Sequence, residues 1–260
     1  MKKILFLYLI TISVIACKKE TPESATKDII PFAELLDNYY EEGLKLNPLN
    51  ATMAGDNRYN DQFPDILSPA YKANVKEYYE SYKSQLSNYP DASLSDTEKL
   101  SKAILQWDCD INLEALTYKK DLMPIDQMWS PHLMFGQLAS GASAQPFETV
   151  EDYRNWEKRV DQYLVWLSSA QKNMKQGMEE GYTLPKSLIK KVIPQMESMA
   201  KPDVTSHLFY TPIINFPESI SEEDQKAITA DYIAMIQNKV IPAYREIADF
   251  MTKEYMEAGR

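Results

Sequence analysis

The chain has 260 residues, with 38 acidic and 28 basic side chains and a formal net charge of −10. An acidic chain of this kind repels the phosphates of nucleic acids and anionic lipid head groups, and no basic cluster reverses this locally, so we expect no nucleic-acid partner. It contains only seven glycines but seventeen tyrosines, a composition that argues against a β-barrel or sandwich and against glycine-rich phosphate loops.

The N-terminus has the pattern of an export signal. Lys2 and Lys3 precede an uncharged apolar run, Ile4 to Ala16, which is short for a membrane span of about 20 residues. Val14-Ile15-Ala16 directly before Cys17 resembles the lipobox of bacterial lipoproteins, in which the cysteine takes a diacylglycerol and the chain is cut just before it. The alternative is an ordinary cleaved signal in which Cys17 is incidental.

This reading divides the chain into three parts. Residues 1–16 are the signal peptide, residues 17–27 are a lipidated cysteine with a polar, flexible tether, and residues 28–260 form a helical domain. The lipobox resemblance implies a protein of the cell envelope, anchored to a membrane through the lipid on Cys17.

Apolar residues recur at three- and four-residue steps along nearly the whole domain, which predicts helices throughout. We expect an all-α fold of six or seven helices, several of them long and kinked at prolines, in an irregular bundle. In chain order, the expected helices span about 28–46, 69–86, 95–118, 133–139, 150–179, 185–199 and 221–255.

Local signals mark several helix ends and faces. Ser95 and Glu98 have the spacing of a capping box, and Gly181 suits the C-terminal cap of the longest helix. The helix from residue 95 runs through Leu100, Ile104, Trp107 and Ile111, which we expect to be a buried stripe.

Three residues that could carry chemistry have simpler structural explanations. Cys109 lies four residues from both Leu105 and Leu113, so we expect a buried, inert thiol. His132 and His207 lie far apart in the sequence without an H-E-x-x-H string, and we expect each to be hydrogen-bonded locally. A catalytic zinc takes three protein ligands, so we predict neither a complete metal site nor a catalytic residue in this chain.

The most distinctive polar stretch is residues 47–61, NPLNATMAGDNRYND. We favour a connector in which polar side chains form turns and Arg58 pairs with Asp56 or Asp61. The functional alternative is a loop that presents Asp56, Arg58 and Asp61 to a cleft.

This stretch also resembles the start of a bacterial family, catalogued as domain of unknown function 885. Further matches follow in order, and the resemblance covers about residues 29–260. They are Glu151-Asp152-Tyr153 through Arg159, Gly181 to Pro185, Phe216 to Ile220, Pro242-Ala243-Tyr244 and Lys253-Glu254-Tyr255.

Members of that family are often lipoproteins about twice this length, and they look like zinc metallopeptidases related to the thermostable carboxypeptidase Taq group. Their implied zinc motif, in the C-terminal half, has no match here. The resemblance therefore implies the N-terminal, non-catalytic half of such a hydrolase, inactive alone. Zinc and a peptide substrate belong to the full-length protein, and a missing C-terminal half is the expected partner.

The alternative function comes from a different class. A helical surface lipoprotein could bind glycans or peptides without catalysis, because aromatic faces stack on sugars and pack against peptides.

Overall fold

The computed structural model describes residues 29–260, which contain helices and no strand. The predicted all-α class is confirmed. The predicted signal peptide, the lipidation site at Cys17 and the tether lie outside the described residues. No helix in the described region combines the length and hydropathy that crossing a membrane requires.

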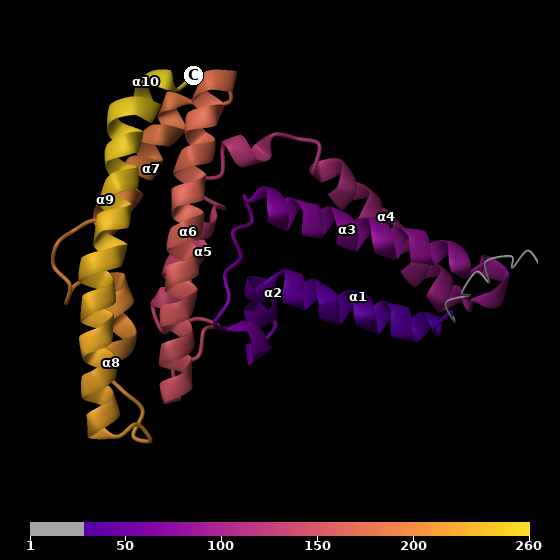
Figure 1. The fold of residues 1–260 in the computed structure, drawn as a ribbon, viewed down its shortest axis with the longest axis horizontal. Coiled ribbons are helices and arrows are strands. Elements are labelled where there is room, and N and C mark those ends of the chain that lie inside the picture. Colours follow the sequence, from indigo (N-terminus) through magenta and orange to yellow (C-terminus); the bar gives the residue numbers. More distant parts are fainter. Residues whose placement is uncertain (1–28) are drawn as a thin grey trace, which may run out of the picture.

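The helices form two groups (Figure 1). The first, which we call the arm, projects sideways and consists of α1 (Phe32–Leu46), α3 (Pro69–Gln85) and α4 (Asp96–Ala115). The second, which we call the bundle, consists of α5 (Pro131–Ala139), α6 (Val150–Glu180), α7 (Lys186–Met199), α8 (Glu222–Met235), α9 (Ile241–Phe250) and α10 (Met256–Ala258). The short helix α2 (Pro48–Met53) follows α1 where the arm meets the bundle.

Each group has its own hydrophobic core. The core of the arm is small and consists of Phe32, Leu35, Tyr82, Leu86, Tyr89, Leu94, Leu105 and Cys109. The core of the bundle is larger and centres on the buried face of α6, where Trp156, Tyr163 and Trp166 are completely enclosed. Phe63 and Leu67, in the connection between α2 and α3, belong to the bundle core.

The longest helix, α6, has strong signals at both ends. The Thr149 hydroxyl accepts a hydrogen bond from the amide of Asp152, and the Asp152 carboxylate accepts one from the amide of Thr149. Gly181 then ends the helix in the left-handed conformation, at φ 78°, which glycine adopts without strain. These caps fix the axis around which the bundle packs.

The helical segments outnumber the six or seven predicted, partly because the last helix is interrupted. Two π-helical segments, η6 (Ile236–Val240) and η7 (Met251–Tyr255), separate α8, α9 and α10. The first comes just before Pro242, whose ring and missing N–H disrupt regular α-helical hydrogen bonding to the preceding turn. In this helix the expected proline kink is therefore a widened turn beside Pro242.

The prediction for the buried face of α4 was wrong. Leu100, Ile104, Trp107 and Ile111 are exposed, whereas Leu105 and Cys109 point into the core of the arm. The helix carries apolar residues on more than one face, and α3 covers only one of them. Sequence spacing identifies a face, but the neighbouring helix decides whether that face is buried.

Candidate functional site

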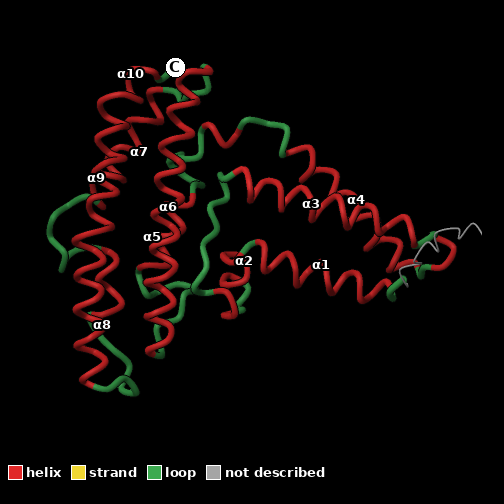
Figure 2. The backbone as a smooth tube through the Cα atoms, viewed as in Figure 1, coloured by secondary structure: helices red, strands yellow, loops and turns green. Residues whose placement is uncertain are grey.

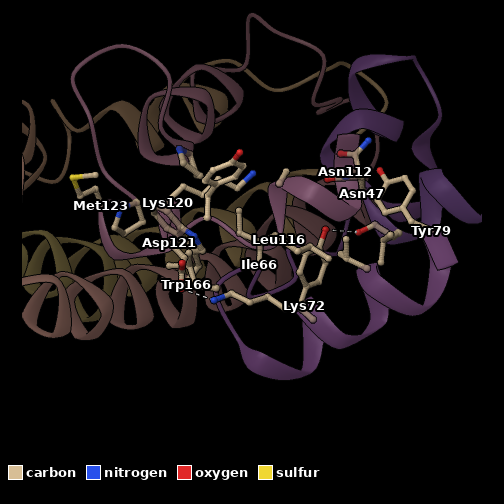
Figure 3. Close-up of a pocket in the computed structure, with 18 residues that line it drawn as sticks. Asn47, Ile66, Lys72, Tyr79, Asn112, Leu116, Lys120, Asp121, Met123 and Trp166 are labelled. Atoms are coloured by element: carbon tan, nitrogen blue, oxygen red, sulfur yellow. Dashed lines mark hydrogen bonds and ion pairs between the residues drawn. The ribbon is translucent and has the colours of Figure 1, made fainter. Parts of the chain in front are cut away.

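A cleft of about 470 Å³ lies where the arm meets the bundle (Figure 3). Most of its lining is apolar, and only a few polar groups enter it, which is the usual character of a ligand pocket. The lining residues are Leu46, Asn47, Ile66, Leu67, Tyr71, Lys72, Val75, Tyr79, Asn112, Ala115, Leu116, Tyr118, Lys120, Asp121, Met123, Pro124, Pro131 and Trp166.

One wall of the cleft is a face of α3. The Ser68 hydroxyl caps this helix by accepting a hydrogen bond from the amide of Tyr71 at 3.1 Å, and Pro69 occupies the first helical position. Tyr71, Val75 and Tyr79 follow at four-residue steps, so all three lie on one side of the helix and line the cleft.

An ion pair crosses the cleft. Lys72 on α3 pairs with Asp121 in the short 3₁₀ segment η4 (Lys120–Leu122). The backbone carbonyl of Asp121 accepts a hydrogen bond from the Asn173 side chain on α6 at 3.1 Å. The pair therefore joins the arm to a segment that is fixed on the bundle.

Two further polar groups of the cleft have no partner, within the described residues, for part of their charge or hydrogen-bonding capacity. The ammonium group of Lys120 forms no ion pair there, although the neighbouring Asp121 does. The Asn112 amide nitrogen donates to the Asp108 carbonyl at 2.8 Å, and the Asn112 side-chain oxygen accepts no hydrogen bond. Together they offer one cation and one neutral acceptor.

The buried side of the cleft is formed by Trp166 of α6. Its side chain is fully enclosed and contacts the rings of Phe63 and Tyr163. The indole N–H has no hydrogen-bond partner in the described part of the chain. An unpaired buried donor costs about 1–3 kcal/mol, and this nitrogen is enclosed rather than open to the cleft.

Tyrosines of α1 and α3 form hydrogen bonds behind the wall of the cleft that α3 provides. Tyr39 donates to the carboxylate of Asp108, and the Tyr78 hydroxyl donates to the carbonyl of Tyr39 at 2.6 Å. Burial, aided by the charge of Asp108, raises the pKa of Tyr79 to about 12. The phenol of Tyr79 is therefore a neutral group in the cleft at physiological pH.

In the polar stretch 47–61, the three residues that could have lined a cleft instead form hydrogen bonds elsewhere. The Arg58 side chain donates three hydrogen bonds to the Asp56 carboxylate and one, of 2.7 Å, to Glu41 of α1. These hydrogen bonds hold the pKa of the Asp56 carboxyl below its usual range. Asp61 is not a partner of Arg58, and its backbone carbonyl accepts from Gln162 at 2.8 Å. None of Asp56, Arg58 and Asp61 lines the cleft described above.

The residue that organises this stretch is Arg159, which sequence reasoning did not single out as a site. Its guanidinium is fully buried and donates to the carbonyls of Gln62 and Tyr59 at 3.0 and 2.7 Å, to the Gln145 side chain at 2.7 Å and to the Thr52 hydroxyl at 2.9 Å. All four acceptors are uncharged. Burial lowers the pKa of Arg159 to about 10.

A signal for Arg159 was present in the sequence. The residue lies among Trp156, Val160 and Tyr163, which form the buried stripe of α6. A charged side chain within such a stripe must find buried partners, and a polar segment elsewhere in the chain is the natural source of them.

Both histidine rings are hydrogen-bonded, His207 locally, as expected, and His132 to one local partner and one on α7. His132 Nδ1 lies 2.6 Å from the Ser130 hydroxyl, and its Nε2 lies 3.0 Å from the side-chain oxygen of Gln195. His207 Nε2 lies 3.1 Å from the carbonyl of Met199, and its Nδ1 accepts a backbone N–H. Burial lowers the pKa of both rings. Among residues 29–260, no group of three or more His, Cys, Asp or Glu side chains is placed to hold a metal ion.

Comparison with known proteins identifies relatives of this architecture. A family model described as "Bacterial protein of unknown function (DUF885)" matches residues 48–260. The crystal structure of "the putative lipoprotein from Colwellia psychrerythraea" superposes with a TM-score of 0.72 over 88% of this chain, at 14% sequence identity. This identity supports similarity of fold alone. The present chain covers 41% of the length of that protein, and no curated protein matches it.

Proposed function

This chain belongs to the DUF885 family of bacterial proteins, and we propose that it is the N-terminal, non-catalytic half of a zinc-dependent, peptidase-like lipoprotein. The observation that carries the proposal is the length relationship: a protein of the same fold has more than half of its chain outside the matched region. The family resemblance assigns the zinc motif to a C-terminal half, which corresponds to no part of this sequence.

The residues present do not fit zinc. All four ring nitrogens of His132 and His207 lie within hydrogen-bond distance of partners, and the described residues provide no third ligand beside either ring. In this proposal the ion and its ligands belong to the other half, and the present chain contributes binding surface.

The cleft suits a peptide side chain. A volume of about 470 Å³ lies within the range of ligand pockets, about 300–1,000 Å³. The apolar lining suits an aliphatic or aromatic side chain. The side-chain oxygen of Asn112 and the ammonium group of Lys120 supply an acceptor and a charge for the peptide backbone or a terminal carboxylate.

The lipoprotein part of the proposal is supported by the lipobox-like sequence before Cys17 and by the structural neighbour, which is itself described as a putative lipoprotein. Expression of the whole precursor in bacteria fed radiolabelled palmitate tests it. We expect label on the wild-type protein and none on the Cys17→Ser variant. Equal labelling of both, or of neither, contradicts it.

Activity measurements test the hydrolase part. Residues 18–260 are purified, titrated with zinc and assayed on short peptides with apolar side chains. We expect no stoichiometric zinc and no turnover from this chain alone. Tight binding of one zinc ion, or peptide turnover, contradicts the assignment of this chain as the non-catalytic half.

Peptide binding to the cleft is tested separately by tryptophan fluorescence, with peptides that carry leucine or phenylalanine beside a free carboxylate. Lys120→Ala should weaken binding about fivefold, the equivalent of ~1 kcal/mol. Lys172→Ala, which removes an exposed lysine of α6 that does not line the cleft, is the matched control. Equal weakening by both variants contradicts a role for the cleft.

Glycan binding is the second candidate function. It is favoured by the three tyrosines with exposed surface that line the cleft, Tyr71, Tyr79 and Tyr118, because aromatic faces stack on sugars. The same fluorescence titration, repeated with neutral oligosaccharides, distinguishes the two candidates. Saturable oligosaccharide binding without peptide binding favours the glycan-binding lipoprotein.

A further inference from the structure

One face of α4 is apolar and exposed to solvent. Its members are Leu100, Ile104, Trp107 and Ile111, which are 62%, 57%, 62% and 44% exposed, and Tyr118, just past the end of the helix, which is 61% exposed. We call these five residues the α4 stripe. A contiguous exposed apolar surface of this kind marks an interaction site more often than single apolar residues do.

The packing of the arm does not account for the α4 stripe. The arm uses a different face of the helix, on which Leu105 and Cys109 are buried near Tyr82 and Leu86. Within residues 29–260, no element covers the stripe.

The pattern of the α4 stripe indicates what would cover it. From Leu100 to Ile111 the steps alternate between four and three residues, which is the spacing of a seam between two packed helices. Three of the five members are aliphatic. Aliphatic side chains fill the spaces between helices, whereas a sugar-binding surface requires a row of aromatic faces.

We propose that the α4 stripe is the surface on which a helix packs that belongs to the polypeptide following residue 260 in the longer protein. In this arrangement α4 joins the two halves. This inference rests on the proposed function above and deepens it by assigning the surface through which the halves meet.

The position of the chain end supports this occupant. Arg260 donates to the carbonyls of Leu184 and Thr183 at 3.1 and 2.9 Å. The next residue towards the N-terminus, Tyr182, lies beneath the ammonium group of Lys119 at 5.4 Å from its ring centre. Lys119 directly follows the last member of the α4 stripe, in the segment that leads from α4 to the bundle (Figure 2). A chain continuing from residue 260 would therefore start at the end of the bundle that contacts the segment directly after the stripe.

The extent of the α4 stripe argues against a second copy of the chain as its occupant. A stable interface between separate proteins buries about 800 Å² on each side and uses about 20–30 residues of each partner, whereas the stripe offers five. A partner on the same chain needs less contact, because covalent linkage gives it an effective concentration in the millimolar range.

A matched pair of substitutions tests the proposal. Ile104→Glu places a charge within the α4 stripe, and Ile214→Glu places one at an isoleucine of almost equal exposure, 59%, in the bundle. Both positions are on the surface, so thermal unfolding by circular dichroism should match that of the wild type. The probe is the longer protein, which continues past residue 260, compared with residues 18–260 alone by hydrogen exchange. In the wild type and in Ile214→Glu, the amide hydrogens of α4 should exchange at least tenfold more slowly in the longer protein, whereas in Ile104→Glu they should exchange equally fast in both.

The other outcomes separate the two proposals. If the longer protein binds zinc and turns over peptides but protects α4 equally in both variants, the docking inference fails while the proposed function stands. If the chain forms a concentration-dependent dimer that Ile104→Glu abolishes, a second copy occupies the stripe and the inference also fails. A downstream sequence without zinc ligands contradicts the proposed function itself.

Discussion

Arg159 on α6 donates a hydrogen bond of 2.9 Å to the hydroxyl of Thr52, which lies 107 positions earlier in the chain, and both side chains are completely buried. The Thr52 hydroxyl lies 2.5 Å from the side-chain oxygen of Asn60, whose amide nitrogen donates to Asn57 at 2.9 Å. This network fastens α2 and the following turn to the bundle. The polar stretch 47–61 is therefore ordered by a charge from outside it.

Replacement of Arg159 by methionine should destabilise the protein by roughly 3 kcal/mol, because buried acceptors lose their donor while a side chain of similar length remains. Urea denaturation followed by circular dichroism measures the change. Arg58→Met is the matched control: Arg58 is exposed, and its loss should have a much smaller effect on the urea midpoint. Equal effects would show that the buried network adds no stability.

Gly177 permits a close approach between α6 and two other segments. A Cβ atom at this position would lie 2.6 Å from the Tyr182 carbonyl oxygen and 2.7 Å from that of Leu122, both of them backbone atoms. Gly177→Ala should therefore lower the stability by roughly 2 kcal/mol through overpacking, despite the better helix propensity of alanine. Thermal unfolding tests this. A variant as stable as the wild type would mean that these segments move apart without cost.

Cys109 should not react with thiol reagents in the folded protein. The side chain is fully enclosed, as its sequence spacing predicted, and burial raises its pKa to about 11. In residues 18–260 it is the only cysteine, so a thiol-specific chromophore at pH 8 reports on it alone. We expect no labelling of the native chain and one equivalent in 6 M guanidinium. Rapid labelling of the native chain would indicate that the arm opens readily.

The stability of the protein should decline in alkaline solution above about pH 10. Burial raises the pKa of Tyr79 and of Tyr153 to about 12, whereas a phenol in the unfolded chain ionises near 10. Between these values the folded state holds more protons, so their contribution is fully present below pH 10 and is lost as the pH rises towards 12. Arg159, whose pKa is lowered by burial, acts with the opposite sign but is outnumbered by the buried tyrosines.

The measurement for this prediction is urea denaturation from pH 8 to 11.5, with absorbance at 295 nm to follow phenol ionisation. The urea midpoint should fall above pH 10, and the buried phenols should ionise together with unfolding. Full ionisation while the circular dichroism of the fold persists would refute it.

The parts of the fold that the sequence predicted well are those encoded locally. The capping box of Ser95 with Glu98 and the terminal glycine of α6 occur as expected, because each depends on residues within one or two turns. The burial of α4 could not be predicted in the same way, because it depends on which helices lie beside it. The stripe from Leu100 to Ile111 has the spacing of a core face, but its side chains are exposed to solvent instead of packing against another helix.

The candidate site was harder to predict because its parts are distant in sequence. The cleft combines side chains from α3, from the segment that contains η4, and Trp166 of α6, and no short motif connects them. Arg58 lies within the polar stretch 47–61, yet the arginine that binds this stretch most extensively is Arg159, 100 positions after Tyr59 in the chain. The spacing of residues within one segment cannot show which charged side chain from a distant part of the chain will form hydrogen bonds with it.

The two separate cores give the molecule two units that can open independently. The arm is stabilised by a much smaller core than the bundle, so amide hydrogens of α1, α3 and α4 are set to exchange with solvent through partial unfolding while those of α6 remain protected. One wall of the cleft belongs to the arm and the opposite side to the bundle. A ligand held between them would slow exchange in the arm, and occupancy of the cleft could be followed by mass spectrometry before the ligand is identified.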